Sequence, residues 1–344
     1  MGSGDFSRPD DGRLKPPLPY TNASRVFQRI PMITMDRLRE RLAAANAWRE
    51  INEALGLNLS PEALAKEVLT KPENDWIVWQ AFVDGSIKSK PLRDKLHRHP
   101  FPDGPLLWSY SGDSLEYHVG GGLASAIRIT SKAENRQHPF ESASKVLDFG
   151  CGISRILRYL IEFCSGPQYY ASEVVPDFIR WGQHAFPEAT YLPQQNRPPL
   201  AMQEGSLEII YAYSIFTHFE EKLHRLWLSE LHRLLQPDGL LILTVHGETI
   251  LRRCQGEEHV RKELCVVGRN YDDLLRKFYR DGYVFYKCYE PKHLAKGGID
   301  ARKYGIAYIS QDYINKNWSN QFQLLEYDKG GDGNWQDYVI LKRR

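Results

Sequence analysis

The segment at residues 145–160 constrains the fold more than any other part of the chain. Apolar residues lead to Asp148, Gly150 and Gly152 follow, and apolar residues then recur at three- and four-residue steps. This order predicts a buried strand, a tight glycine turn and a helix. Because glycine has no side chain to block contact and tolerates positive φ, the backbone of such a turn can approach a ligand closely. The sequence therefore predicts a ligand site at this turn.

The details of the turn exclude one common ligand. A dinucleotide site needs the pattern G-x-G-x-x-G, with the pyrophosphate at the N-terminus of the helix. Here the last glycine of that pattern would fall at Arg155, and an acid, Asp148, already stands at the end of the strand. A carboxylate beside the turn favours instead a ligand that carries positive charge.

The loop resembles the cofactor loop of class I methyltransferases, in which apolar residues, an aspartate and G-x-G surround S-adenosylmethionine. That cofactor carries an ammonium and a sulfonium group. One departure from the family pattern is Ser154, which stands where a third glycine is common. The resemblance implies that S-adenosylmethionine is the cofactor and that it contacts Asp148, Gly150, Cys151 and Gly152.

A second acid follows the next predicted strand. Residues 168–173 end in Glu173, 21 positions beyond Gly152, which is the distance expected for a helix, a turn and a parallel strand. The resemblance implies that Glu173 accepts hydrogen bonds from both ribose hydroxyls, whereas a surface glutamate is the alternative. A helix from Pro176 and a third strand at residues 190–192 come next. In related enzymes a side chain near this place meets the adenine, and Asn196 is the predicted contact.

Two histidines follow the predicted fourth and fifth strands. The apolar runs at residues 207–214 and 240–245 are typical of strands buried in a parallel sheet. Ser214, His218 and His246 therefore lie at the carboxyl edge, where such sheets bind ligands, and Ser214 is a predicted cofactor-binding residue. Histidine, with an unperturbed pKa of about 6.5, can accept a proton near neutral pH. We predict that His218 is the catalytic base and that His246 is its competitor.

Each histidine also has a structural interpretation. His218 could only hydrogen-bond the backbone of its turn, and His246, which precedes Gly247, could only shape the entrance to the next segment. That segment is far longer than the usual connection of about 2–6 residues. It predicts a lid insertion at about residues 248–310, with helical pieces within 260–277 and a strand at 283–289 that pairs with 304–310.

The chain closes with a predicted antiparallel hairpin of residues 322–327 and 337–341. The predicted fold class is therefore α/β. It is a doubly wound, seven-stranded, mostly parallel sheet with an antiparallel terminal hairpin, a helical N-terminal extension and a lid insertion.

Segments of residues 103–344 resemble one bacterial subfamily of these methyltransferases, associated with glycan or secondary-metabolite modification. They include residues 214–219, 235–239, 243–247 and 304–310. The resemblance implies in-line transfer of a methyl group to a hydroxyl of a sugar, glycan or secondary metabolite. The implied substrate-binding residues are Tyr117, His118, Tyr304, Tyr308, Gln336 and Asp337.

Three alternatives stay open at this point. The acceptor atom could be a nitrogen of a small molecule. The chain could also bind the cofactor without catalysis and serve as an interaction partner, although the intact Asp148, glycine loop and Glu173 argue against loss of activity. Tyr117 and His118 could be an ordinary buried tyrosine and a surface histidine.

The N-terminal third carries no chemistry of its own in the sequence. Residues 1–30 are rich in proline, glycine, serine and charge, and are predicted to be mobile or draped over the surface. Residues 31–100 are predicted to be a helical extension, with one helix at 35–57 that stops near Gly56 and a second that begins at Ser60. This extension could cover a substrate cleft or pack on the sheet. Residues 101–344 are the predicted methyltransferase domain.

Composition excludes several functional classes. The 45 basic and 43 acidic residues give a net charge of only +2, and no basic run suits nucleic acid. Five cysteines, an odd number without paired metal-type spacing, predict reduced thiols and no metal site. The first residues contain no apolar core of signal-peptide length, and no segment approaches the apolar length of a membrane span. We therefore expect a cytoplasmic protein with a small-molecule or glycan acceptor, and no nucleic-acid partner.

Overall fold

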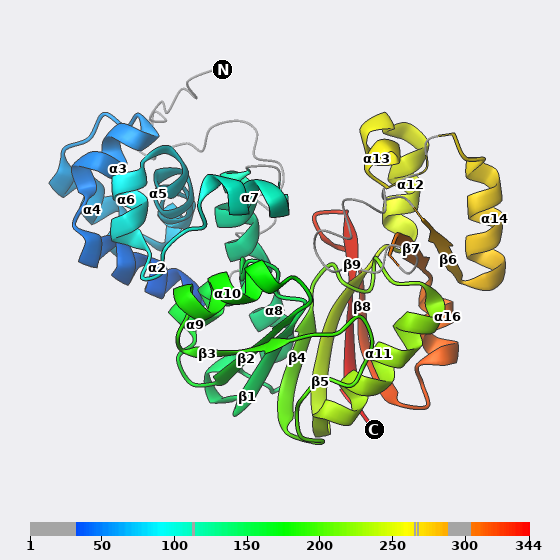
Figure 1. The fold of residues 1–344 in the computed structure, drawn as a ribbon. Coiled ribbons are helices and arrows are strands. Elements are labelled where there is room, and N and C mark those ends of the chain that lie inside the picture. Colours follow the sequence, from blue (N-terminus) through cyan, green and yellow to red (C-terminus); the bar gives the residue numbers. More distant parts are fainter. Residues whose placement is uncertain (1–31, 112–113, 265, 267, 288–303) are drawn as a thin grey trace. The chain divides into compact units, whose positions relative to one another are not determined.

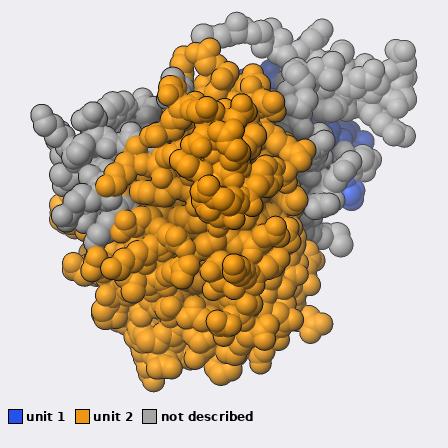
Figure 2. Space-filling model, turned by 90° about the vertical axis from the view of Figure 1, so that its right-hand side faces the viewer, with its two compact units in different colours: residues 1–131, 158–163 blue, residues 132–157, 164–344 orange. Residues whose placement is uncertain are grey.

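The structure is a computed structural model that describes residues 32–111, 114–264, 266, 268–287 and 304–344. The chain divides into two compact units: unit 1 is residues 1–131 with 158–163, and unit 2 is residues 132–157 with 164–344 (Figure 2). The predictions for residues 1–30 and for 288–303 of the lid lie outside the described residues. The functional domain boundary predicted at residue 100 remains a prediction. The division into compact units does not test it, because a functional domain can begin at a different residue from a compact unit.

Unit 1 is helical, as predicted for the N-terminal part of the chain. The Ser60 hydroxyl accepts a hydrogen bond from the Ala63 N–H at 3.2 Å and so caps the start of its helix, while Gly56, at φ +64°, ends the helix before it. The helices are α2 (Met32–Ala45), α3 (Trp48–Leu55), α4 (Pro61–Thr70), α5 (Asp75–Lys88), α6 (Lys90–Leu96), α7 (Gly104–Ser111) and α8 (Gly122–Glu134), of which α8 runs on into unit 2.

The prediction of a single helix at residues 35–57 was wrong, because the chain forms two helices there, α2 and α3. Asn46 adopts a left-handed conformation, at φ +46°, which an α-helix does not accommodate. The apolar spacing continues across this break, and it therefore concealed the end of α2.

The sheet of unit 2 confirms the predicted fold class. It has seven strands in the order β3-β2-β1-β4-β5-β9-β8, of which the first five are parallel and the last two form the antiparallel hairpin (Figure 1). The strands are β1 (Lys145–Phe149), β2 (Gln168–Glu173), β3 (Ala189–Pro193), β4 (Leu207–Ala212), β5 (Leu235–Val245), β8 (Phe322–Asp332) and β9 (Gln336–Arg343).

The connections make the sheet doubly wound. From β1 the chain moves outward to β2 and then β3, whereas β4 returns to the other side of β1 and leads outward to β5. Right-handed crossovers therefore place α10 (Pro176–Ala185) and α11 (Glu221–Leu234) on opposite faces of the sheet. The strand order reverses between β1 and β4, and ligands of such sheets bind at the carboxyl ends of the strands at this point.

The starts of α9 and β5 differ by several residues from the predictions. The helix after the glycine loop, α9 (Leu157–Phe163), begins four residues later than its apolar spacing predicted, because Ser154 takes a left-handed conformation at φ +61°. Strand β5 begins at Leu235, directly after α11, where the backbone is already extended and pairs with Leu207. Within this connection Asp238 has a positive φ of 62°.

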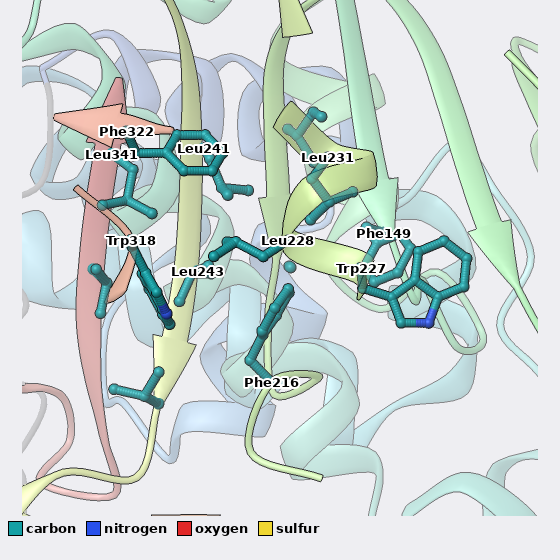
Figure 3. Packing of buried hydrophobic residues seen from close by; sticks show 14 of the residues in the cluster. Phe149, Phe216, Trp227, Leu228, Leu231, Leu241, Leu243, Trp318, Phe322 and Leu341 are labelled. Carbon is teal, nitrogen blue, oxygen red and sulfur yellow. The ribbon is translucent and has the colours of Figure 1, made fainter. Parts of the chain in front are cut away.

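The core of unit 2 lies between the sheet and the helices α11 and α16 (Gln311–Asn317). Trp227 of α11 packs its ring 4.9 Å from the ring of Phe149 on β1, and Trp318, next to α16, is also buried (Figure 3). The cluster includes Leu231, Leu241, Leu243, Phe322 and Leu341. It anchors the strands whose carboxyl ends carry the candidate site.

The lid insertion has its own apolar core, as expected for a connection that is too long to be an ordinary loop. Strands β6 (Tyr283–Tyr286) and β7 (Ile306–Ile309) pair antiparallel, which confirms the pairing predicted for this segment. The lid helices are α12 (Glu248–Gly256), α13 (Glu258–Glu263) and α14 (Tyr271–Asp281), and they share a buried cluster with the two strands. Across the described ranges, no helix of either unit combines the length and apolarity that a membrane crossing needs.

Candidate cofactor and acceptor site

The glycine loop follows β1 and is hydrogen-bonded to the end of β2. The N–H groups of Gly150 and Cys151 both donate to the Ser172 carbonyl, at 2.9 and 3.0 Å. Gly150 has φ +78°, and a Cβ there would overlap the side chain of Ile215. Gly152 has φ +54°. The loop therefore needs glycine at Gly150 for both its conformation and its close packing.

Ser154 occupies the position where related loops carry a third glycine, and it keeps a glycine-like backbone. Its φ is +61°, and its hydroxyl lies 2.6 Å from the hydroxyl of Tyr191 on β3. A serine at this position is therefore accommodated through a side-chain hydrogen bond, and this departure from the family pattern leaves the loop intact.

Glu173 is buried at the end of β2 and holds the glycine loop. Its carboxylate accepts hydrogen bonds from the backbone N–H groups of Gly152, Val174 and Val175, at 2.8, 2.7 and 3.0 Å. Burial raises the pKa of Glu173, and these hydrogen bonds offset a part of the effect. The spacing that singled out Glu173 does bring it to the loop, while its contact with a ribose stays a prediction.

Asp148 lies at the end of β1 and is almost fully buried. Burial raises its pKa from 3.8 to about 7, Tyr211 lowers it, the nearby Glu173 raises it and Arg155 lowers it. Two buried carboxyl groups thus lie near each other beside the loop. A ligand with positive charge would stabilise their ionised forms, so this part of the structure fits a cofactor that carries an ammonium and a sulfonium.

Arg155 is a site residue that the sequence reasoning missed. It is buried in the loop, and its guanidinium carbon lies 5.2 Å from the ring centre of Tyr213, just beyond β4. The Tyr213 hydroxyl in turn donates to Asp332 of β8. In the sequence Arg155 was notable only as the place where a dinucleotide glycine is lacking, and no local signal indicated its partners.

Asn196 lies in the segment between β3 and β4, and its contact with adenine stays a prediction. The structure gives a clear position to another residue of this segment, Gln194. Its side-chain oxygen accepts from the Ser172 hydroxyl at 2.9 Å, and its N–H donates to the Glu173 carbonyl at 2.8 Å. Gln194 therefore ties this segment to the strand that carries Glu173.

Ser214 and Gln336 are brought together at the end of β4. Ser214 has φ +59°, its N–H donates to the Thr244 hydroxyl at 2.8 Å, and its own hydroxyl accepts from the Gln336 amide at 2.9 Å. Ser214, a predicted cofactor residue, and Gln336, a predicted substrate residue, are thus hydrogen-bonded to each other, although they are far apart in the sequence.

His218 is fixed by the lid. Its Nδ1 lies 2.9 Å from the Gly305 carbonyl oxygen, and its ring stacks on Tyr304 with centres 4.7 Å apart and planes 11° apart. A carbonyl can only accept a hydrogen bond, so Nδ1 carries the proton and Nε2 carries the lone pair of the neutral ring. Burial lowers the pKa of His218 to about 4, and the hydrogen bond to Gly305 offsets a part of the effect.

His246 is buried at the end of β5, beside the lid strand β7. Its carbonyl accepts from the Ile309 N–H at 2.8 Å, and the Tyr308 ring lies 6.0 Å away. Burial, and then the nearby His218, lower the pKa of His246 to about 3, and a hydrogen bond with the Ala307 backbone offsets a part of the effect. Its Nδ1 has no hydrogen-bond partner in the part of the chain that the structure describes. The two predicted histidines therefore do lie near each other.

Two other predicted acceptor residues already have structural partners. The Tyr308 hydroxyl donates to the Leu264 carbonyl at 2.8 Å. Asp337 is fully buried, and its two carboxylate oxygens accept from the Tyr327 hydroxyl and the Gly330 N–H, each at 2.7 Å. Within the described ranges neither oxygen bonds an imidazole. Burial raises the pKa of Asp337.

Tyr117 and His118 belong to unit 1, and their contact with a substrate stays a prediction. Tyr117 is 41% exposed, whereas His118 is fully buried, so the alternative of a buried tyrosine and a surface histidine was wrong. His118 Nε2 lies 3.3 Å from Arg158 Nη1, and its ring meets the ring of Phe101 edge to face.

Helix α9 carries a buried polar cluster that the sequence reasoning also missed. Glu162 accepts from the Arg98 N–H at 3.0 Å and pairs with His97 and His99 at 3.7 and 3.4 Å. One turn earlier, Arg158 donates to the His99 carbonyl at 2.8 Å. The helix that follows the cofactor loop therefore supplies two charged groups to the core of unit 1. Among the residues with described positions, no group of three or more candidate ligands could hold a metal ion.

Comparisons with known proteins give one family match and several similar solved structures. Residues 147–243 match a family model described as a methyltransferase domain. No curated protein sequence matches the chain. Similar solved structures include the 1,6-didemethyltoxoflavin-N1-methyltransferase from Burkholderia thailandensis with bound 1,6-didemethyltoxoflavin and S-adenosylhomocysteine (13% identity, 71% of this chain and 92% of that chain covered, TM-score 0.44).

Two further structures are similar to a comparable degree. One is the N-methyltransferase NodS from Bradyrhizobium japonicum WM9 in complex with S-adenosylhomocysteine (9% identity, 70% and 99% covered, TM-score 0.41). The other is the PH0226 protein from Pyrococcus horikoshii OT3 (13% identity, 69% and 96% covered, TM-score 0.43). The matched segment contains the glycine loop, Asp148, Glu173 and His218. Residues 147–243 thus match a methyltransferase domain, a match that indicates S-adenosylmethionine as the cofactor.

Proposed function

We propose that the chain methylates a hydroxyl of a small molecule, namely a sugar, a glycan or a secondary metabolite, and that His218 accepts the proton of that hydroxyl. The observation that carries this proposal is the hydrogen bond between His218 Nδ1 and the Gly305 carbonyl, because it sets the tautomer of the ring and leaves the lone pair on Nε2.

The cofactor side of the proposal assigns a task to each residue around the loop. The backbone of Gly150, Cys151 and Gly152 approaches the cofactor, Asp148 faces its positive charge, and Glu173 meets the ribose. When bound, S-adenosylmethionine supplies a methyl group on a positively charged sulfur. The protein then has to hold the acceptor oxygen in line with that methyl group, since orientation supplies much of the rate in such displacements.

The acceptor side depends on two neutral imidazoles. With pKa values of about 4 and about 3, His218 and His246 are both unprotonated at neutral pH. An alcohol has a pKa far above neutral, so its proton must be accepted as the new bond forms. In the proposal His218 performs this step, while His246, whose Nδ1 has no partner among described residues, donates to or accepts from the acceptor.

The proposal is tested by finding the product. The purified chain is incubated with methyl-labelled cofactor and fractionated cell extract, and the labelled compound is identified by mass spectrometry. A labelled hydroxyl on a small molecule or glycan supports the proposal. A labelled nitrogen supports the N-methyltransferase alternative, label only in protein or RNA contradicts both, and cofactor binding without any labelled product supports a non-catalytic partner.

The role of His218 is tested on the identified product. The His218→Ala variant should lower the turnover rate by about a hundredfold and leave the affinity for S-adenosylmethionine nearly unchanged. His184→Ala, which removes an exposed histidine of α10, is the control. If turnover survives in His218→Ala and collapses in His246→Ala, the two roles are reversed. If both variants stay active, the proton leaves to water and the enzyme acts by proximity. A cytoplasmic location stays a prediction from the sequence.

A further inference from the structure

Tyr211 of β4 lies beside the cofactor aspartate. Asp148 and Tyr211 are paired in the register of β1 and β4, and paired residues of parallel strands project to the same face of the sheet. Both side chains are buried, and Tyr211 is completely so. The Tyr211 hydroxyl makes no well-formed hydrogen bond to any described residue. A buried phenol hydroxyl normally has a partner, so this one needs an explanation.

Asp148 is the group to which the Tyr211 hydroxyl can donate a hydrogen bond. After burial, the charge of Asp148 and its hydrogen bonding are the main influences that raise the pKa of Tyr211, and Tyr211 has the largest effect among the groups that lower the pKa of Asp148. A hydroxyl hydrogen can rotate toward its acceptor without a movement of the ring. A phenol that donates to a carboxylate favours the ionised carboxylate.

The other charged or titratable groups near Asp148 act with smaller effects. Glu173 at the end of β2 opposes its ionisation, and Arg155 in the loop favours it. Cys151 is also close, and its thiol stays protonated because burial raises its pKa well above the usual value. Of the groups that favour the carboxylate, Tyr211 is therefore the most influential, and it lies on a strand inside the core rather than in the loop.

We propose that Tyr211 is a positioning residue of the cofactor site, whose hydroxyl donates to Asp148 and favours the ionised carboxylate that meets the positive charge of the cofactor. The inference rests on the cofactor role proposed for Asp148. Its consequence is that cofactor affinity falls as the pH drops through the range in which Asp148 takes up a proton, and that Tyr211 sets where this range lies.

The test is the affinity for S-adenosylmethionine as a function of pH, measured by calorimetry between about pH 6 and 8.5. In Tyr211→Phe the midpoint of the affinity loss should move up by about one pH unit, because one donor to a charged group is removed. At the wild-type midpoint the affinity then falls about fivefold, and toward the upper end of the range the difference disappears. The amine of the cofactor titrates equally in all samples, so only differences between variants are interpreted.

Two comparison variants make the result decisive. Tyr169→Phe removes the hydroxyl of another buried tyrosine, on β2, which bonds the Cys164 carbonyl at 2.7 Å, and it should keep the wild-type profile. Asp148→Asn should bind weakly and lose the pH dependence. An affinity loss in Tyr211→Phe that is equal at every pH, or an unchanged profile, overturns the role of Tyr211 alone. A wild-type profile in Asp148→Asn overturns the role of Asp148 and the inference with it.

Discussion

Replacement of Asp148 by asparagine should make the cofactor-free protein more stable above neutral pH. In the folded protein burial raises the pKa of Asp148 from 3.8 to about 7, so between these values the folded state keeps a proton that the unfolded chain releases. Stability must then fall as the pH rises through this range, and the loss is complete above about pH 7. The difference in pKa corresponds to about 4 kcal/mol. Asparagine has nearly the same shape and carries no charge, so it avoids this loss.

The assay is urea unfolding of the wild type and Asp148→Asn at pH 5 and pH 8, without cofactor. At pH 8 the variant should be the more stable protein, with about 4 kcal/mol as the upper limit, since the buried amide has to satisfy its own hydrogen bonds. At pH 5 the difference should be much smaller, because the wild-type carboxyl is then mostly protonated in the folded state. Addition of S-adenosylmethionine should stabilise the wild type and hardly affect the variant.

One result would refute this reasoning. If Asp148→Asn is less stable than the wild type by the same amount at both pH values, the carboxylate is already compensated inside the free protein, and the site holds no unbalanced negative charge for a cofactor to neutralise. The exposed Asp312 of α16 offers the matched control, because Asp312→Asn makes the same chemical change at the surface. That variant should differ from the wild type by less than about 0.5 kcal/mol at either pH.

Three other substitutions test separate parts of the structure. Gly150→Ala should lower stability by about 1–3 kcal/mol and abolish cofactor-induced stabilisation in thermal unfolding, because its Cβ would overlap Ile215 at a positive φ. Gly247→Ala should lower turnover and leave calorimetric cofactor affinity intact, because its Cβ would overlap the Asp337 carboxylate. Glu162→Gln should lower the unfolding free energy by about 3 kcal/mol at pH 7. This loss should shrink below pH 4.5, because a lowered pKa of Glu162 stabilises the fold only at higher pH.

The arrangement of the candidate cofactor residues could be predicted from the sequence because its signals are local. The order of strand, glycine turn and helix places Asp148 and Gly150, and the length of one crossover places Glu173 beside the same turn. The parallel sheet then follows from alternating strands and helices, and its carboxyl edge follows from the direction of the chain. Where this reasoning erred, a residue other than glycine had a left-handed backbone: Asn46 divides one predicted helix, and Ser154 delays another.

Pairings between distant segments could not be predicted. Tyr211 reaches Asp148 only through the register of two strands, and a shift of one residue would turn it to the other face. His218 Nδ1 bonds the carbonyl of Gly305, 87 residues away, and no residue spacing indicated this contact. Residue spacings along a strand or helix contain no information about such contacts, since burial and hydrogen bonding between segments are decided only when the chain has folded.

The backbone contacts of lid strand β7 explain why the proposed acceptor residues were harder to predict from the sequence than the residues of the glycine loop. The N–H groups of Gly305, Ala307 and Ile309 donate to the carbonyls of His218, Thr217 and His246, at 3.0, 2.8 and 2.8 Å. Both histidines are therefore attached through their backbones to the same short segment, so a change in the lid would move both imidazoles together. The family match ends at residue 243, before His246 and the lid. The glycine loop makes none of these hydrogen bonds within the described residues, so a change in the lid could alter the proposed acceptor side without altering the loop.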